Sequence, residues 1–265
     1  AVATVFFTGE NQWKKFAQWP PAEEKERSLY LQPGGGLAWE KPSGSSSGQA
    51  STGTAGYDEY ISDPAHPVPY TEDIHFNRTR EYMTDDQRFA SRRTDVLTYQ
   101  TPVLTEDLTL GGPLTADLKV SLSGEDADFV VKLIDVFPEE FTYGNVPAAA
   151  GHEPPRSYPM GGYQMLVRGE VMRGRFRESF EKPVPFKPGR IETVRFSIPD
   201  VAHTFKKGHR LMVQVQSSWF PLVDRNPQKF VNIYTCDDSD FQKETIRLYH
   251  DGEHPSMLVL PVIKS

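Results

Sequence analysis

Gly208-His-Arg-Leu-Met-Val-Gln-Val-Gln-Ser-Ser-Trp-Phe-Pro-Leu-Val-Asp-Arg-Asn-Pro227 is the stretch that decides the fold class. After a turn at Lys207-Gly208, the side chains at positions 211, 213 and 215 are apolar and fall on one side, while Met212, Gln214 and Gln216 fall on the other. This period of two predicts a half-buried β-strand. The strand is expected to end at the proline, which has no backbone N–H to donate.

The end of this strand also carries the first functional prediction. Trp219 and Phe220 are two large rings in an irregular loop, and Arg225 follows with a guanidinium that can pair with a carboxylate. This combination predicts a docking edge for another protein surface, formed by Trp219, Phe220 and Arg225. The alternative is that the rings close the end of the domain's own core.

Strand patterns recur along the rest of the chain, separated by Gly- and Pro-rich turns. They occupy residues 2–8, 28–32, 37–40, 57–61, 95–99, 108–110, 114–122, 128–137, 163–176, 191–198, 246–249 and 257–263. Residues 111–113 are expected to form a turn, and residues 21–27 at most one or two exposed helical turns. About ten strands with almost no helical periodicity predict an all-β antiparallel sandwich of the jelly-roll, galactose-binding-domain-like type with long irregular loops.

We expect one domain over residues 1–265, with N-terminal hairpins in 1–62, a long loop in 63–92 and the main sandwich in 93–265. The loop is unusually long and contains several aromatic residues, including Phe76 and Tyr82. Long loops without regular structure are functional or disordered, and aromatic residues argue against disorder. The stretch from Tyr70 to Arg88 within this loop is therefore the second predicted interaction surface.

Composition restricts the function classes. The net charge is −7, which leaves no surplus of basic residues to neutralise nucleic-acid phosphates. The single cysteine, Cys236, excludes an internal disulfide. The sequence has no apolar run long enough for a membrane span and no signal-peptide pattern, and it begins with alanine. We expect a soluble piece of a longer protein, cytoplasmic or exported, with any targeting signal outside it.

No catalytic or metal-binding signature stands out, and no cofactor is expected. The seven histidines are spaced singly, and Asp237-Asp-Ser-Asp240 lacks the pattern of a calcium loop. Gly44-Ser-Ser-Ser-Gly48 matches the G-x-S-x-G nucleophile elbow around Ser46, but a Ser/Gly tract surrounds it where a strand and a helix are needed.

Charged residues within strand patterns give two further expectations. Asp135 lies among apolar residues and is expected to pair with an arginine or with backbone donors. Arg173, Arg175 and Arg177 alternate along one strand and are expected to form a solvated face.

Several blocks, taken in order, resemble one known family. They are Asp85-Asp-Gln-Arg88, Arg93-Thr-Asp-Val-Leu97, the run from Gly124 to Pro138, the opening stretch through Asn226, and Glu253-His-Pro-Ser256 with Leu260-Pro261. Together they resemble the C-terminal domain of the X-Pro dipeptidyl-peptidase and cocaine-esterase family, which includes α-amino-acid ester hydrolases and glutaryl acylases. The resemblance covers nearly the whole chain.

This resemblance implies a non-catalytic jelly-roll domain of a serine hydrolase. Its partner would be an α/β-hydrolase domain of the same polypeptide, which carries the nucleophile and the catalytic histidine. The parent substrate would be a small ester or amide, or an X-Pro peptide. By position in the family, the loop before Asp85 reaches the substrate cleft, so His75, Phe76 and Tyr82 are the candidate cleft residues.

Two other functions remain open at this point. The first is a carbohydrate- or surface-binding module, with Trp13, Trp19, Trp39 and Trp219 as platform residues. The second is an autonomous hydrolase built on Ser46, which the surrounding tract disfavours.

Overall fold

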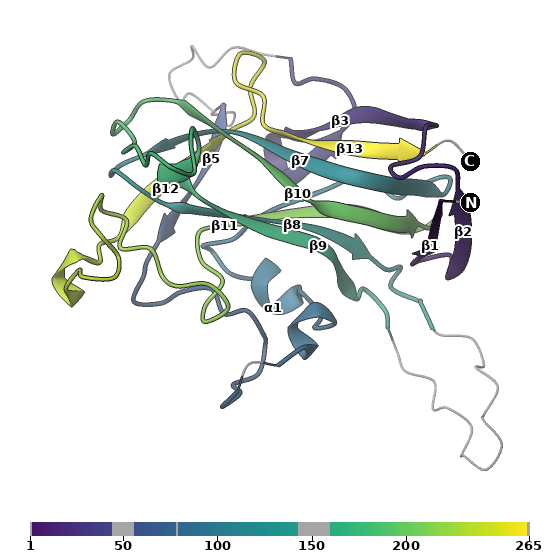
Figure 1. Ribbon diagram of the computed structural model, residues 1–265, viewed down its shortest axis with the longest axis horizontal. Helices are drawn as coiled ribbons and strands as arrows, with labels where there is room; N and C mark the ends of the chain where they lie inside the picture. The colour runs from purple at the N-terminus through teal and green to yellow at the C-terminus, as the bar shows by residue number, and fades with distance from the viewer. Residues whose placement is uncertain (1, 44–55, 78, 143–159, 264–265) are drawn as a thin grey trace.

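The computed structural model describes residues 2–43, 56–77, 79–142 and 160–263. Ser46, proposed above only as a weak nucleophile candidate, lies outside these ranges. The chain forms a two-layer, almost entirely antiparallel β-sandwich, as predicted. A separate two-stranded sheet, formed by β1 (Ala3–Phe7) and β2 (Gln12–Phe16), stands at one end (Figure 1).

The first layer is built around one long strand, β7 (Leu108–Leu122). One edge of β7 pairs with β10 (Glu192–Phe205) over most of its length. The other edge pairs with β13 (Met257–Ile263) and then with β12 (Glu244–Tyr249). Outside these lie β3 (Glu24–Gln32) on β13 and β5 (Tyr57–Ser62) on β12.

The second layer contains β6 (Leu97–Gln100), β11 (Arg210–Gln216), β8 (Asp128–Val136) and β9 (Gln164–Arg173), in that order. The short strand β4 (Gly36–Ala38) connects the layers, because it pairs with β3 and makes a parallel bridge to β6. β3 and β4 form the predicted hairpin around Pro33–Gly35.

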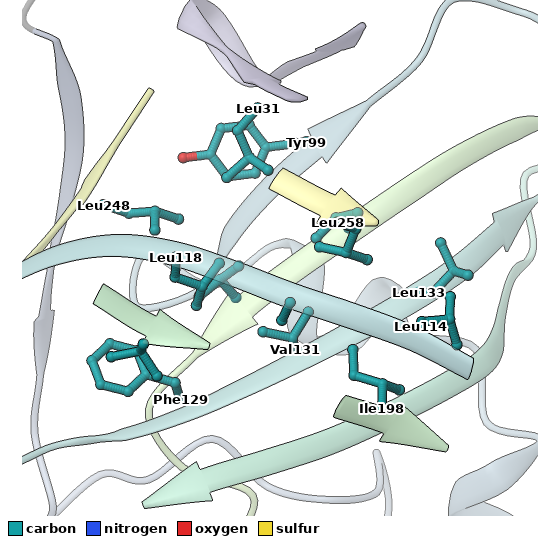
Figure 2. Packing of buried hydrophobic residues seen from close by; sticks show 14 of the residues in the cluster. Leu31, Tyr99, Leu114, Leu118, Phe129, Val131, Leu133, Ile198, Leu248 and Leu258 are labelled. Carbon is teal, nitrogen blue, oxygen red and sulfur yellow. The ribbon is translucent and has the colours of Figure 1, made fainter. Parts of the chain in front are cut away.

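The core lies between the layers and is almost wholly aliphatic. Leu114 and Leu118 of β7 face Val131 and Leu133 of β8, and Leu258 of β13 packs with them (Figure 2). Burying each such side chain contributes about 1.5–3 kcal/mol. β8 is buried along almost its whole length, so both of its faces are covered.

Three local predictions were wrong. β11 is buried on both faces, because the long loop covers the side that carries Gln214 and Gln216. Residues 111–113 are not a turn but a bend inside β7, where Gly112 has a φ of +139° and the pairing of β10 and β13 shifts register. Much of the segment 21–27 belongs to β3 instead of a helix, because it pairs with β13.

In the residues that the structure describes, helix is confined to short turns. They are η1 (Pro33–Gly35), η2 (Glu81–Met83), α1 (Arg88–Ser91), η3 (Gly174–Phe176) and η4 (Asp238–Asp240). In the described part of the chain, no helix has the length and apolar character to cross a membrane.

Candidate interaction surface

The long loop between β5 and β6 covers the outer face of the second layer. Figure 1 shows it, with η2 and α1, on the side of β8, β9 and β11 away from β7 and β13. Its anchor is Gln87, which is almost fully buried; its side-chain oxygen accepts a bond of 3.0 Å from Lys132 Nζ. Gln214 Nε2 donates to the backbone oxygen of Gln87 at 3.3 Å. The polar residues of β8 and β11 thus bind the loop that covers them.

Lys132 is the most unusual group beneath this loop. Its exposed fraction is 0%, and its Nζ lies 5.1 Å from the Trp219 ring centroid and 5.8 Å from that of Phe89. Burial disfavours the charged amine and lowers the pKa of Lys132 to about 7. A single amide oxygen and two ring faces therefore hold this amine, with no carboxylate among the contacts described.

Trp219 lies over Lys132 and packs within the chain. Trp219 is only 7% exposed and its ring meets that of Tyr82 edge-on with centroids 5.9 Å apart, while the tilted rings of Tyr82 and Tyr70 lie 5.5 Å apart. Val130 completes the cluster. The structure thus brings one predicted cleft residue, Tyr82, against one predicted docking residue, Trp219, although the sequence separates them widely.

The other two predicted docking residues lie on a different side of the loop. Phe220 is partly exposed, and its backbone pairs with that of Val68 and Tyr70. Arg225 is half-buried; it donates to the backbone oxygen of Pro64 at 2.9 Å and lies 5.7 Å from the Phe220 ring centroid. The docking role of Trp219, Phe220 and Arg225 remains a prediction, in which Phe220 is the exposed side chain of the three.

The two remaining predicted cleft residues stand away from the body of the domain. Phe76 is fully exposed, as is Ile74 beside it. His75 Nε2 lies 4.0 Å from a carboxylate oxygen of Glu81. An exposed phenyl ring has no stabilising contact here, so its position suits contact with something outside this chain.

A buried ionic network supports the second layer at its other end, and it corrects the expectation for the arginine series. Arg175 binds Asp126 through Nε at 2.7 Å, and Arg173 binds Asp128 through two nitrogens at 3.0 and 2.9 Å. Asn226 donates to both carboxylates. Arg177 pairs with Glu192 and is itself buried. These arginines are structural partners instead of a solvated face, because acidic residues of neighbouring segments meet them.

Sequence reasoning missed a buried histidine–aspartate–histidine group. Asp135 accepts from His203 Nε2 at 3.1 Å and from His209 Nδ1 at 2.8 Å, so two imidazoles replace the expected arginine or backbone donors. His203 Nδ1 lies 2.8 Å from the Thr8 hydroxyl. The backbone of Thr8 is bonded to Ala202 and Thr204 of β10, so the group ties the N-terminal hairpin to the sandwich.

The four tryptophans do not form a shared platform. Trp19 donates to Asp200 at 2.6 Å and packs on Phe7 and Phe16, while Trp39 packs on the core beneath Arg27. Trp13 is 69% exposed and contacts Phe6. The described residues contain no group of three or more His, Cys, Asp or Glu side chains arranged to hold a metal.

A groove runs between the N-terminal hairpin and the long loop, and we call it the β1–β9 groove. Its volume is about 780 Å³. Apolar side chains from five segments supply most of its lining: Val5, Phe6, Tyr82, Met83, Met160, Met165, Leu166, Val167, Val201 and Trp219. The groove therefore contains both Tyr82 and Trp219.

Comparison with known proteins gives one family and several long relatives. Residues 4–259 match the family described as the X-Pro dipeptidyl-peptidase C-terminal non-catalytic domain. The cocaine esterase of Rhodococcus sp. (strain MB1 Bresler) is 32% identical over 260 residues, which are 98% of this chain and 41% of the relative.

Two solved structures of longer proteins are also similar to this chain in sequence and fold. An aminopeptidase from a marine sediment archaeon, Thaumarchaeota archaeon, superposes with a TM-score of 0.84 at 41% identity. An α-amino acid ester hydrolase gives the same TM-score at 42% identity. In both cases 98% of this chain covers 40% of the other. The chain thus spans about two-fifths of the length of the relatives it matches.

Proposed function

Because the chain belongs to the family of X-Pro dipeptidyl-peptidase C-terminal non-catalytic domains, we propose that it is the β-sandwich domain of a larger serine hydrolase. In this proposal it packs on an α/β-hydrolase domain of the same polypeptide and helps to shape the substrate cleft. The hydrolase domain supplies the nucleophile and the histidine.

The observation that carries this proposal is the family match over residues 4–259, which is nearly the entire chain. The relatives are more than twice as long, and their names describe an esterase, an aminopeptidase and an ester hydrolase. All three reactions attack an ester or amide carbonyl. The proposed parent substrate is therefore a small ester or amide, or an X-Pro peptide.

The role in the cleft rests on the long loop. Gln87 anchors one part of this loop on Lys132, while Phe76 and Ile74 extend into solvent. A fixed base with an exposed aromatic tip is suited to closing one wall of a cleft formed mainly by another domain. His75, Phe76 and Tyr82 are the residues proposed to line that wall.

Hydrolysis of p-nitrophenyl acetate tests the main proposal. The polypeptide encoded by the complete reading frame around this chain should hydrolyse the ester and lose activity with phenylmethylsulfonyl fluoride. The 265-residue chain alone should show no hydrolysis above buffer. Turnover by the isolated chain that the same reagent abolishes would overturn the proposal.

The cleft role needs a separate measurement. In the complete polypeptide, Phe76→Ala should raise the KM for the ester substrate by about tenfold, since burying a phenyl ring contributes about 1.5–3 kcal/mol. Phe180→Ala is the matched control, because Phe180 is also an exposed phenylalanine but lies on another loop. Equal KM values for the two variants would reject the cleft role while leaving the hydrolase assignment intact.

A further inference from the structure

Three exposed apolar side chains of this domain, Phe6, Met83 and Trp13, lie in or beside the β1–β9 groove. Phe6 and Met83 line it and are 38% and 48% exposed. Trp13 extends this surface, because its ring packs on Phe6 with centroids 5.3 Å apart. An apolar surface that continues from a groove onto its rim is typical of a site that another protein surface covers.

Among the described residues that line the groove, Arg168 is the one that carries a charge, and its Nε already donates to the backbone oxygen of Asp200. Three methionines, Met83, Met160 and Met165, contribute to the walls. Methionine side chains adapt to irregular apolar partners, and charged groups are depleted in the centre of protein interfaces.

The floor of the groove is packed against other side chains of this domain. It is formed by Trp219, which packs on Val130 and on the Tyr70–Tyr82 pair, and by Gly169. A Cβ at position 169 would lie 3.1 Å from the Trp219 ring, so the glycine lets the two surfaces approach. A preformed floor lowers the ordering cost that a partner has to overcome on binding.

We propose that the β1–β9 groove is the docking site for the hydrolase part of the same polypeptide, and that an apolar segment of that part fills it. This inference rests on the proposed function and adds which face of this domain contacts the hydrolase part. In a family of C-terminal domains the catalytic part comes first, so the chain enters through β1, whose Val5 and Phe6 line the groove. The partner is thereby tethered beside its own site, where a high effective concentration favours this occupant over a free protein.

Methionine oxidation tests the proposal without any substitution. Hydrogen peroxide converts accessible methionine to the sulfoxide, which mass spectrometry counts residue by residue. Met83 and Met165 should oxidise at least about fivefold more slowly in the complete polypeptide than in the isolated chain, since a covering partner excludes the oxidant. Met257 is half-buried in β13, outside the groove, and should oxidise at the same rate in both.

A matched pair of variants provides the second measurement. In the complete polypeptide, Met83→Lys introduces a charge into the groove and should restore fast oxidation of Met165. Phe180→Lys introduces the same charge at an exposed phenylalanine elsewhere and should leave Met165 protected. Both residues are exposed in the isolated chain, so the domain itself should remain folded.

Each outcome decides the proposal. Equal oxidation rates of Met83 and Met165 in the two forms overturn it, even if the complete polypeptide hydrolyses esters and the proposed function stands. Protection that appears in the isolated chain on raising its concentration assigns the groove to a second copy and also overturns it. If the complete polypeptide has no hydrolase activity, the proposed function fails independently.

Discussion

Lys132 is expected to make the stability of the domain depend on pH. Its pKa is about 7 in the folded state, against an ordinary value of 10.5. Below pH 7 the amine is charged in both states, so the folded state bears the full cost of burying it. As the pH rises from 7 to 10.5 the folded state binds fewer protons than the unfolded state, and the free energy of unfolding increases.

Lys132→Met should remove this dependence. At pH 6 the variant should be more stable than the natural chain by an amount on the order of a few kcal/mol, and the difference should shrink as the pH approaches 10. Urea denaturation at several pH values measures it, with the exposed Lys182→Met as control. A difference between variant and natural chain that does not change with pH would contradict the assignment.

Glu244 is expected to give a slope of the opposite sign. Burial raises the pKa of its carboxyl to about 8 from an ordinary 4.5, while the Gly124 N–H donates to Oε1 at 2.5 Å. Below pH 4.5 the group is protonated in both states. Between 4.5 and 8 the folded state binds more protons than the unfolded state, so stability is lost as the pH rises through this range.

Glu244→Gln should therefore match the natural chain near pH 4 and exceed its stability at pH 9 by an amount on the order of 1–3 kcal/mol. The glutamine retains an oxygen for the Gly124 N–H and carries no charge. Glu178→Gln, at an exposed glutamate, should show no such pH-dependent gain in the same urea titration. If Glu244→Gln gains no more stability with rising pH than Glu178→Gln, the pKa of Glu244 is not raised. Its buried carboxyl is then ionised at neutral pH.

Among the structural elements, the loop after β11 is tested by comparing the stability of variants at its two rings, Trp219 and Phe220. Trp219 covers Lys132 and supports Tyr82, so Trp219→Ala should destabilise the isolated domain by about 3–5 kcal/mol. It should also return the pKa of Lys132 towards its ordinary value, because water reaches the amine. Phe220→Ala, at the partly exposed neighbour, should cost less than about 1 kcal/mol. Equal unfolding free energies for the two variants would show that Trp219 is not part of the core.

The strands show what could be predicted from the sequence. β8 and β13 were predicted nearly to their ends, because a period of two or a continuous apolar run is a local signal. The start of β11 was also predicted, but this strand ends at Gln216 and not at the expected proline. The bend inside β7 was missed, because Gly-Gly-Pro is also typical of a turn. Only pairing with β10 and β13 on both sides keeps the chain extended there.

The candidate site was less predictable, because its contacts join distant residues. Asp135 meets His203 and His209 across 68 and 74 positions, and no spacing rule connects them. The same holds for Trp219 and Tyr82, which were predicted separately for different roles. The signal available was Asp135 and Lys132 within an apolar run, which indicates buried polar partners without naming them.

On the scale of the whole molecule, docking through the groove should couple the stability of this domain to the rest of the polypeptide. A partner that contacts only the folded state stabilises it by mass action. Trp13 lies on the rim and packs on Phe6, so in the isolated chain Trp13→Ser removes little buried surface and should change Tm by less than about 2 °C.

In the complete polypeptide the same substitution should lower the Tm of this domain by about 3–6 °C, because a ring buried at the interface is worth about 1.5–3 kcal/mol. Phe180→Ser, which removes an exposed ring that is not part of the groove lining, should leave the Tm of both forms unchanged. Calorimetry of the two forms measures the effect. A Tm decrease of equal size in both forms of Trp13→Ser would mean that the ring stabilises only its own hairpin. The interface with the hydrolase part would then include Phe6 but not Trp13.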